Sequence, residues 1–238
     1  MRNSGRPTSR GVSRSRAAVL FDFGGTLDAP GIPWKDRLFD LFRAEGASVP
    51  LDDFARAFHR ADDALVGTVS PTLSFRDTVV RLVDDVGASL IFDDPRAMRR
   101  IAHGFIESST ACAHANARVL ADLARRYRLG LVSNFYGNLA AVCEDLGLAP
   151  YLSVTVDSAV IGCSKPDPRL FREALGRLTV DVAEAVHVGD SPSRDMAGAR
   201  AVGMAHVWLV GPAARSSAPC CPQDRVIRSL DELPGVLP

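Results

Sequence analysis

Short, uninterrupted apolar runs recur along this chain and are separated by longer stretches in which apolar residues recur at helical spacing. Runs of this kind are typical of strands that are buried on both faces of a parallel sheet. We therefore predict strands over residues 17–21, 129–132, 152–156, 185–188, 205–210 and, as a short last strand, 226–227.

Amphipathic patterns between the later runs predict the helices that connect these strands. Helical spacing extends over 139–146 and over 170–178, and the second pattern follows Pro168, a residue suited to a first turn. A third helix is predicted over 196–201, ending at Gly203. Because strands alternate with helices, we predict an α/β fold: a doubly wound, Rossmann-like parallel sheet with helices on both faces.

The stretch between the first and second predicted strands contains only helical patterns. Ser74 and Asp77 suit the start of one helix, and Gly87 is predicted to end it. Four apolar stripes lie within residues 34–42, 54–65, 75–86 and 98–106. We predict a helical-bundle cap inserted over the sheet edge, with a core domain of residues 17–28 and 116–238, a cap of residues 29–115 and a disordered basic tail of residues 1–16.

The composition fits a folded protein with a sizeable core. Of the 238 residues, 47% are hydrophobic and 24% are charged, which excludes a chain that is disordered throughout. Lys and Arg total 28 and Asp and Glu total 28, so the formal net charge is zero. This balance, with no apolar run near ~20 residues, predicts neither a nucleic-acid nor a membrane partner.

The chain start and the cysteines bear on the cellular setting. The first 16 residues hold five arginines and no acidic residue, and the following apolar run is interrupted at Asp22. A signal peptide needs a longer apolar stretch, so we predict a solvated tail. The five cysteines include no CxxC pair, which favours a reducing, cytoplasmic setting, and the adjacent Cys220 and Cys221 receive no role.

Polar residues follow the predicted strands at the point where each run ends. Asp22 follows the first run, Ser133 the second, Lys165 lies past the third, and Asp190 and Asp195 follow the fourth. Ligands of open parallel sheets bind outside the carboxyl ends of the strands. We therefore expect these side chains to converge on one rim of the sheet.

This set of residues suits phosphoryl transfer assisted by a divalent cation. A carboxylate at a strand end can attack phosphorus and form an aspartyl phosphate. Mg²⁺ prefers oxygen ligands and offsets the repulsion between two anions. We predict Mg²⁺ as cofactor, held by Asp22, Asp190 and the backbone carbonyl of Gly24.

The remaining rim residues are predicted to hold the phosphate. Lys165 can neutralise a phosphoryl oxygen, and Ser133 can donate a hydrogen bond to another. Gly25 allows the backbone to turn closely around a ligand, and we assign Gly25, Thr26 and Asn134 to substrate binding.

Four segments together resemble the four motifs of the haloacid dehalogenase superfamily with a helical, C1-type cap. They are DFGGTL at 22–27, VSN at 132–134, Lys165 within SKPDP, and GDSPSRD at 189–195. The resemblance implies a hydrolase of a small phosphorylated metabolite, with Asp22 as the nucleophile that forms the aspartyl phosphate and with the phosphate and Mg²⁺ roles given above. It also implies that Asp195 orients Lys165.

One position departs from that pattern. Phosphatases of the superfamily carry a second aspartate two residues after the nucleophile, where this chain has Gly24. That aspartate protonates the leaving oxygen, and general acid–base help is worth ~10²–10⁴ in rate. The loss matters less when the leaving group is stable as an anion, as in an acyl phosphate. Asp28 is either a replacement proton donor or a turn residue before the cap.

Three alternatives remain at this point. The dehalogenase branch also lacks the second aspartate but needs no metal, which leaves Asp190 and Asp195 unexplained. Phosphonate C–P cleavage needs a cap lysine, and Lys35 is the one lysine in the predicted cap. A binding module that retains ligand without turnover is the third. The sequence makes no prediction of the oligomeric state.

Overall fold

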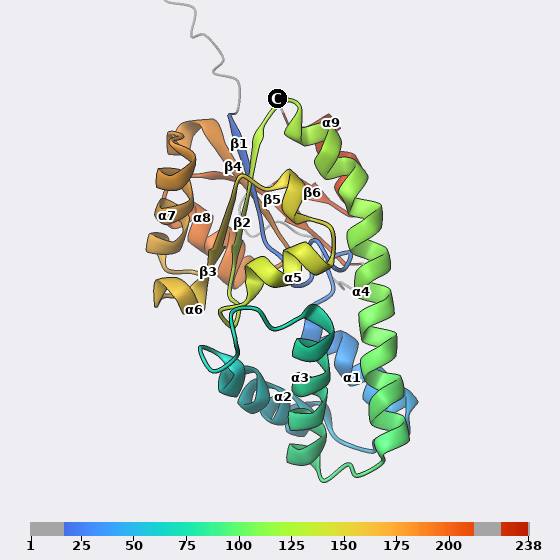
Figure 1. Cartoon of the computed structure of the whole chain (residues 1–238). Coiled ribbons are helices and arrows are strands. Elements are labelled where there is room, and N and C mark those ends of the chain that lie inside the picture. The colour runs from blue at the N-terminus through green and yellow to red at the C-terminus, as the bar shows by residue number, and fades with distance from the viewer. Residues whose placement is uncertain (1–16, 212–224, 238) are drawn as a thin grey trace, which may run out of the picture.

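A computed structural model describes residues 17–211 and 225–237 of the chain (Figure 1). Its strands form one parallel sheet in the order β3-β2-β1-β4-β5-β6, which confirms the predicted α/β fold class. The strands are β1 (Ala18–Phe21), β2 (Arg128–Ser133), β3 (Val154–Asp157), β4 (Ala185–Gly189), β5 (Ala205–Leu209) and β6 (Arg225–Ile227).

The register of the sheet brings the predicted rim residues to one edge. Phe21 of β1 pairs with Leu131 of β2 on one side and with Val188 of β4 on the other. The residues that follow these three strands therefore emerge side by side. The sequence expectation of a shared rim at the carboxyl edge is met by the backbone alone.

Helices cover both faces of the sheet, as the alternating residues of β1 require. Ala18 and Leu20 pack in one apolar cluster with the inner faces of α7 and α8, whereas Val19 and Phe21 pack in the other. The second cluster continues into the helices between β1 and β2. The helices on the sheet are α5 (Leu139–Asp145), α6 (Ser158–Ile161), α7 (Pro168–Leu178), α8 (Ala197–Ala201) and α9 (Leu233–Val236), with a π-helical turn, η3 (Pro192–Met196), before α8.

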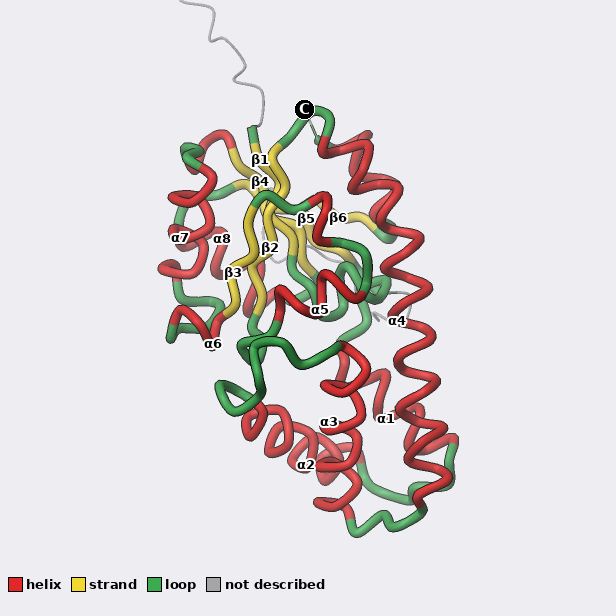
Figure 2. Tube along the Cα trace, in the orientation of Figure 1, coloured by secondary structure: helices red, strands yellow, loops and turns green. Residues whose placement is uncertain are grey.

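Four helices between β1 and β2 form the cap beyond the carboxyl edge of the sheet (Figure 2). They are α1 (Trp34–Ala44), α2 (Leu51–Leu65), α3 (Phe75–Leu90) and α4 (Pro95–Ala124). The last of these runs 30 residues without a break, from the cap along the flank of the core. The division after residue 115 that the sequence suggested therefore falls inside a helix that both parts share.

The start of α3 agrees with its sequence signals, but its end does not. Ser74 accepts a hydrogen bond from the backbone N–H of Asp77 at 3.0 Å, as predicted for a helix cap. The prediction that Gly87 ends the helix is wrong, because α3 continues to Leu90. A Cβ at Gly87 would lie 2.3 Å from Cε of Met98, so the glycine lets α4 approach α3 closely.

Some predictions concern parts of the chain outside the described residues. These are the basic tail over residues 1–16 and the pair Cys220 and Cys221. Within residues 17–211 and 225–237, no helix combines the length and hydrophobicity that crossing a membrane requires.

Candidate active site

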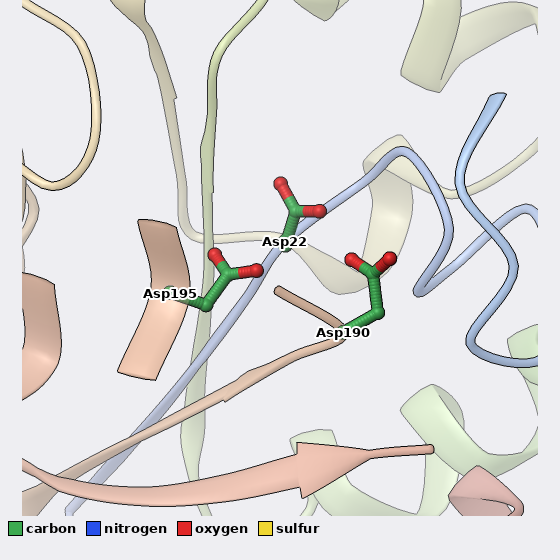
Figure 3. A group of neighbouring side chains, drawn as sticks. All are labelled: Asp22, Asp190 and Asp195. Carbon is green, nitrogen blue, oxygen red and sulfur yellow. The ribbon is translucent and has the colours of Figure 1, made fainter. Parts of the chain in front are cut away.

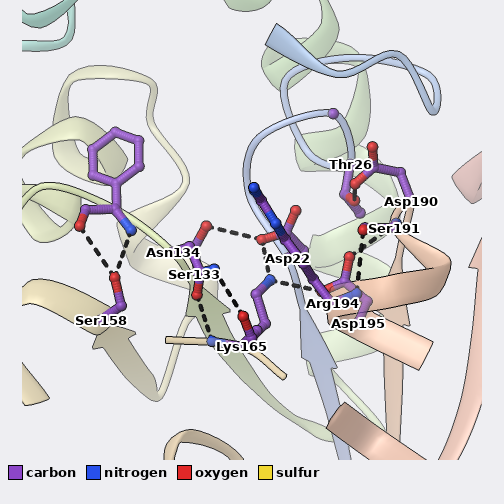
Figure 4. Close-up of polar contacts among 12 residues, drawn as sticks. Asp22, Thr26, Ser133, Asn134, Ser158, Lys165, Asp190, Ser191, Arg194 and Asp195 are labelled. Carbon is purple, nitrogen blue, oxygen red and sulfur yellow. Dashed lines mark hydrogen bonds and ion pairs between the residues drawn. The ribbon is translucent and has the colours of Figure 1, made fainter. Parts of the chain in front are cut away.

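The side chains predicted to share the rim do meet there (Figure 4). Ser133 Oγ donates to Asp22 Oδ1 at 2.8 Å, and Lys165 Nζ donates to the same oxygen at 2.5 Å. Lys165 Nζ also donates to Asp195 Oδ1 at 2.6 Å. All four residues are buried. Lys165 thus bridges the carboxylates that follow β1 and β4.

Asn134 fixes the backbone that carries Lys165. The Lys165 N–H donates to Asn134 Oδ1 at 2.7 Å, and Asn134 Nδ2 donates to the Lys165 carbonyl at 3.2 Å. This double contact fastens the loop after β3 to the end of β2. Asn134, which was predicted to bind substrate, therefore makes hydrogen bonds that position Lys165.

Asp195 is saturated by donors from its own domain. Besides Lys165, the ring Nε2 of His187 lies 3.0 Å from Oδ1, and the Ser191 N–H donates to Oδ2 at 3.0 Å. Although burial opposes its charge, Lys165 and His187 lower the pKa of the Asp195 carboxyl. His187 is fully buried, and its Nδ1 has no hydrogen-bond partner among the described residues.

The pKa values of the other two rim carboxyls, Asp22 and Asp190, are shifted upward instead. Burial raises the pKa of Asp22 even though Lys165 is adjacent. Burial, with the charges of Asp22 and Asp195, raises the pKa of Asp190 well above its usual range. Burial favours the neutral amine of Lys165, but the two carboxylates beside it raise its pKa overall. The pocket therefore holds more negative charge than its lysine offsets.

This charge and the donor set fit a hard divalent cation. One carboxylate oxygen from each of Asp22, Asp190 and Asp195 lies within 4.8 Å of the others, and the three groups face a common space (Figure 3). Asp195 already accepts hydrogen bonds at both oxygens. Asp22 Oδ2 accepts none from the described residues. The oxygens of Asp22 and Asp190 are thus the ones that could ligate such a cation.

Gly25 and Thr26 shape the surroundings of Asp190. A Cβ at Gly25, whose φ is +93°, would lie 2.5 Å from Asp190 Oδ2, so only glycine leaves room for that carboxylate. Thr26 is buried, and its Oγ1 lies 3.4 Å from Asp190 Oδ1. Trp208 of β5 donates from Nε1 to the Asp190 carbonyl at 2.9 Å.

Asp28 is an anchor for the cap. Its buried carboxylate accepts hydrogen bonds from the Gly25 N–H at 2.7 Å and from Trp34 Nε1 at 2.7 Å. Arg37 at 2.8 Å and Ser109 at 3.1 Å donate to the same group. The residue therefore ties the loop after β1 to α1 and α4, and it does not line the cavity described below.

Trp34 occupies the space beside Gly24. A Cβ at Gly24 would lie 3.3 Å from the indole Nε1 and 3.5 Å from Cδ1. The indole packs edge-on against the rings of Phe23 and Phe135. The position where the superfamily's second aspartate would extend is thus bordered by a tightly packed aromatic side chain.

A cavity of about 590 Å³ separates the rim from the cap. Its floor includes Asp22, Lys165 and Asp190, and its opposite wall comes from α2 and the residues after β2. Phe135 and Tyr136 both line it and also pack against Trp34.

Asp62 on the cap wall carries no sequence signal. The Tyr136 hydroxyl donates to Asp62 Oδ1 at 2.6 Å. On the sequence, this aspartate sits on the polar face of an amphipathic helix and resembles any solvated residue. Its place in the cavity follows only from how the cap docks.

Comparisons with known proteins agree with this geometry. A family profile described as haloacid dehalogenase-like hydrolase matches residues 17–203. The mouse haloacid dehalogenase-like hydrolase domain-containing protein 3 is 40% identical over 111 residues, which cover 46% of this chain and 44% of that protein. The match thus spans less than half the length of that relative.

Two further likenesses extend over more of the chain. A phosphoserine phosphatase of Thermus thermophilus is 32% identical over 201 residues, covering 82% of this chain and 73% of that protein. The crystal structure of a 2-haloacid dehalogenase from Pseudomonas syringae pv. tomato has a TM-score of 0.52 and 28% identity, covering 93% of this chain and 98% of that one.

Proposed function

This chain belongs to the haloacid dehalogenase-like hydrolase family, and we propose that it is a Mg²⁺-dependent phosphatase of a small phosphorylated metabolite. Membership makes the chain a hydrolase. The extended likeness to a phosphoserine phosphatase supports phosphorylated compounds as the substrate class. The proposal assigns the nucleophile to Asp22 and the metal to Asp22, Asp190 and the Gly24 carbonyl.

The observation that carries the proposal is the asymmetry of the Asp22 carboxylate. Ser133 and Lys165 hold Oδ1, while Oδ2 accepts no hydrogen bond from the described residues and the side chain lines the cavity. A carboxylate fixed at one oxygen and open at the other is oriented for attack.

In the proposed reaction, Asp22 attacks the phosphorus atom, and the P–O bond to the leaving group breaks. Water then attacks the same phosphorus, which releases inorganic phosphate and restores the carboxylate. Mg²⁺, when bound, supplies positive charge that offsets the repulsion between Asp22 and the phosphate. Two of the three Lys165 N–H donors are engaged by carboxylates, so one remains for a phosphoryl oxygen.

The leaving group must do without a carboxylate at position 24. We therefore propose that acyl phosphates, and other phosphates whose leaving group is stable as an anion, are turned over faster than simple alkyl phosphates. The expected difference is ~10²–10⁴, the usual worth of general acid catalysis.

A phosphate-release assay over a panel of phosphorylated metabolites and p-nitrophenyl phosphate, with Mg²⁺ or with EDTA, tests this function. Asp22→Asn is expected to lower kcat by more than about 10³-fold, and EDTA to abolish release. Asp40→Asn, an exposed aspartate on α1, is the matched control and should leave release unchanged. Release that survives Asp22→Asn would refute the proposal.

Carbon–halogen hydrolysis is the second candidate, because Gly24 and the likeness to a 2-haloacid dehalogenase both favour it. It needs neither a metal nor a leaving-group proton. Halide release from 2-haloacids that persists in EDTA and is lost in Asp22→Asn would establish it in place of the phosphatase. Lys35 lines the cavity, but phosphonate cleavage through a free amine has less support, because its Nζ lies 2.7 Å from the Asp36 carboxylate.

A further inference from the structure

The cap wall of the cavity carries charged groups that the proposed phosphoryl chemistry does not use. Asp62 on α2 lines the cavity, is half-buried, and receives the Tyr136 hydroxyl at 2.6 Å. It forms no ion pair with the described residues. Burial raises the pKa of its carboxyl. An aspartate kept partly from water with a single neutral donor lacks the cation that such a group ordinarily has.

Arg194 borders the same cavity from the core side. It belongs to η3, one residue before Asp195, and its guanidinium forms no hydrogen bond or ion pair with the described residues (Figure 4). Its charge acts on Asp62, as do those of His59 and Asp63, yet the two side chains do not pair. One ligand that carries both a cation and an anion would therefore satisfy both groups.

We propose that Asp62 and Arg194 form a specificity subsite that selects phosphorylated amino acids, with Asp62 receiving the substrate's ammonium group and Arg194 its carboxylate. This inference rests on the proposed phosphatase function and names its substrate class. Tyr136 positions Asp62, because its hydroxyl fixes one oxygen and leaves the other for the ligand. The cavity of about 590 Å³ is large enough for a phosphorylated amino acid beside the rim.

The absence of a carboxylate at Gly24 narrows the class further. An amino acid phosphorylated on a side-chain carboxyl group is an acyl phosphate, so its leaving group departs as a stable carboxylate. Its ammonium and carboxylate remain free to contact Asp62 and Arg194. The rim and the cap wall then favour the same kind of molecule.

Three small achiral phosphates test the contributions of Asp62 and Arg194 to binding one at a time. 2-Aminoethyl phosphate and 2-hydroxyethyl phosphate differ in one ammonium group, and 2-phosphoglycolate adds a carboxylate instead. Dissociation constants are measured by calorimetry with Mg²⁺ on the full chain carrying Asp22→Asn, so that turnover does not interfere. The result is thus independent of whether the wild-type protein releases phosphate, which the assay above decides separately.

We expect 2-aminoethyl phosphate to bind about 10- to 100-fold more tightly than 2-hydroxyethyl phosphate, the usual range for hydrogen bonds to charged groups. Adding Asp62→Asn, which keeps the shape and the acceptor for Tyr136, should remove this preference. Adding Asp52→Asn, an exposed aspartate on the same helix, should keep it.

We expect Arg194 to contribute less to binding than Asp62, because Arg194 is exposed and an exposed ion pair is weak. 2-Phosphoglycolate should bind several-fold more tightly than 2-hydroxyethyl phosphate, and Arg194→Gln but not the exposed Arg172→Gln should remove the difference. A preference for 2-aminoethyl phosphate that survives Asp62→Asn overturns the subsite. So does equal binding of all three probes, or a preference for the carboxylate probe alone.

Discussion

The rim of the sheet and the cap wall border one cavity but hold their polar side chains in different ways. On the rim side, Asp195 accepts hydrogen bonds from three groups, and Asp28, which lies behind the rim and does not line the cavity, accepts them from four. On the wall, Asp62 has one neutral donor, and the facing Arg194 of η3 has no side-chain partner among the described residues. Asp195 and Asp28 are therefore saturated without a ligand, whereas Asp62 and Arg194 are not.

This difference indicates that the rim binds the phosphoryl group and that the wall distinguishes one substrate from another. A saturated set of buried polar groups holds one geometry, because each displacement leaves a donor or acceptor unsatisfied. Such rigidity suits the phosphoryl group, which is the same in every substrate. The unpaired charges of Asp62 and Arg194 instead gain a partner only from a complementary ligand. Substitutions on the rim should therefore change stability and all substrates alike, whereas substitutions on the wall should change discrimination between substrates.

The largest expected effect comes from Asp28→Ala on the rim. This change leaves the buried indole N–H of Trp34 and the partly buried guanidinium of Arg37 without their shared acceptor. We expect the free energy of unfolding to fall by about 3–5 kcal/mol, measured by denaturant titration. Asp40→Ala, an exposed substitution on α1, should change it by less than about 0.5 kcal/mol.

A second variant, Asp28→Asn, tests whether Asp28 only anchors the cap or also donates a proton to the leaving group. Because Asp28 does not line the cavity, Asp28→Asn should slow alkyl phosphates and p-nitrophenyl phosphate by the same factor. A loss confined to alkyl phosphates, whose leaving group needs a proton, would instead make Asp28 the acid. That outcome would also break the contrast, since a rim residue would then discriminate among substrates.

Gly24→Asp probes the border between the two regions. A Cβ at this position lies 3.3 Å from Trp34 Nε1, so an aspartate here requires the indole to shift by a few tenths of an ångström. We expect a loss of about 1–3 kcal/mol in unfolding free energy from overpacking, and no gain in alkyl phosphate turnover. Gly24→Ala, with one added carbon, should cost less.

A second substitution, which replaces the Trp34 indole with a smaller ring, tests whether the indole is what opposes an aspartate at position 24. In the double variant Gly24→Asp/Trp34→Phe, the two changes should couple by about 0.5–3 kcal/mol in unfolding free energy, since the smaller ring yields space. If Gly24→Asp alone were as stable as the wild type and raised alkyl phosphate turnover, Trp34 would not be what fills the acid's place.

Most of the fold could be predicted from the sequence because local pattern and global structure agree there. The strand runs, such as 17–21, are apolar on both faces, and a parallel sheet is the structure that buries both. Prediction failed where a residue serves a partner far along the chain. Gly87 has the local signal of a helix end, but its actual constraint is the approach of Met98 from α4.

The same distinction separates the predictable and unpredictable parts of the site. The meeting of Asp22 and Ser133 follows from strand order, because each residue has a fixed place at a strand end, and the loop after β3 brings Lys165 to them through its backbone contacts with Asn134. Asp62 reaches the cavity only through the docking of α2, and the filling of space beside Gly24 depends on the orientation of one indole. Neither is encoded in spacing along the chain.

The smallest expected effect is that of Tyr136→Phe on the wall. The change keeps a ring of nearly the same shape in the core cluster and removes only the hydroxyl that donates to Asp62. Unfolding free energy should change by about 1 kcal/mol or less, while the preference for 2-aminoethyl phosphate over 2-hydroxyethyl phosphate should fall by about 2- to 10-fold.

The pH dependence of that preference gives this last substitution its own signature. The Tyr136 hydroxyl bond stabilises the charged form of Asp62 and so lowers its pKa, against the effect of burial. Removing the hydroxyl should raise the pKa of Asp62 further, and the preference for the cationic probe, which requires the carboxylate, should then set in at higher pH than in the wild type. His59, Asp63 and Arg194 also face Asp62 but are unchanged in this variant, so the shift reports the hydroxyl alone. Calorimetry across pH 4 to 8 in the Asp22→Asn background measures it. An unshifted onset with a reduced preference would mean that Tyr136 contacts the ligand directly rather than positioning Asp62.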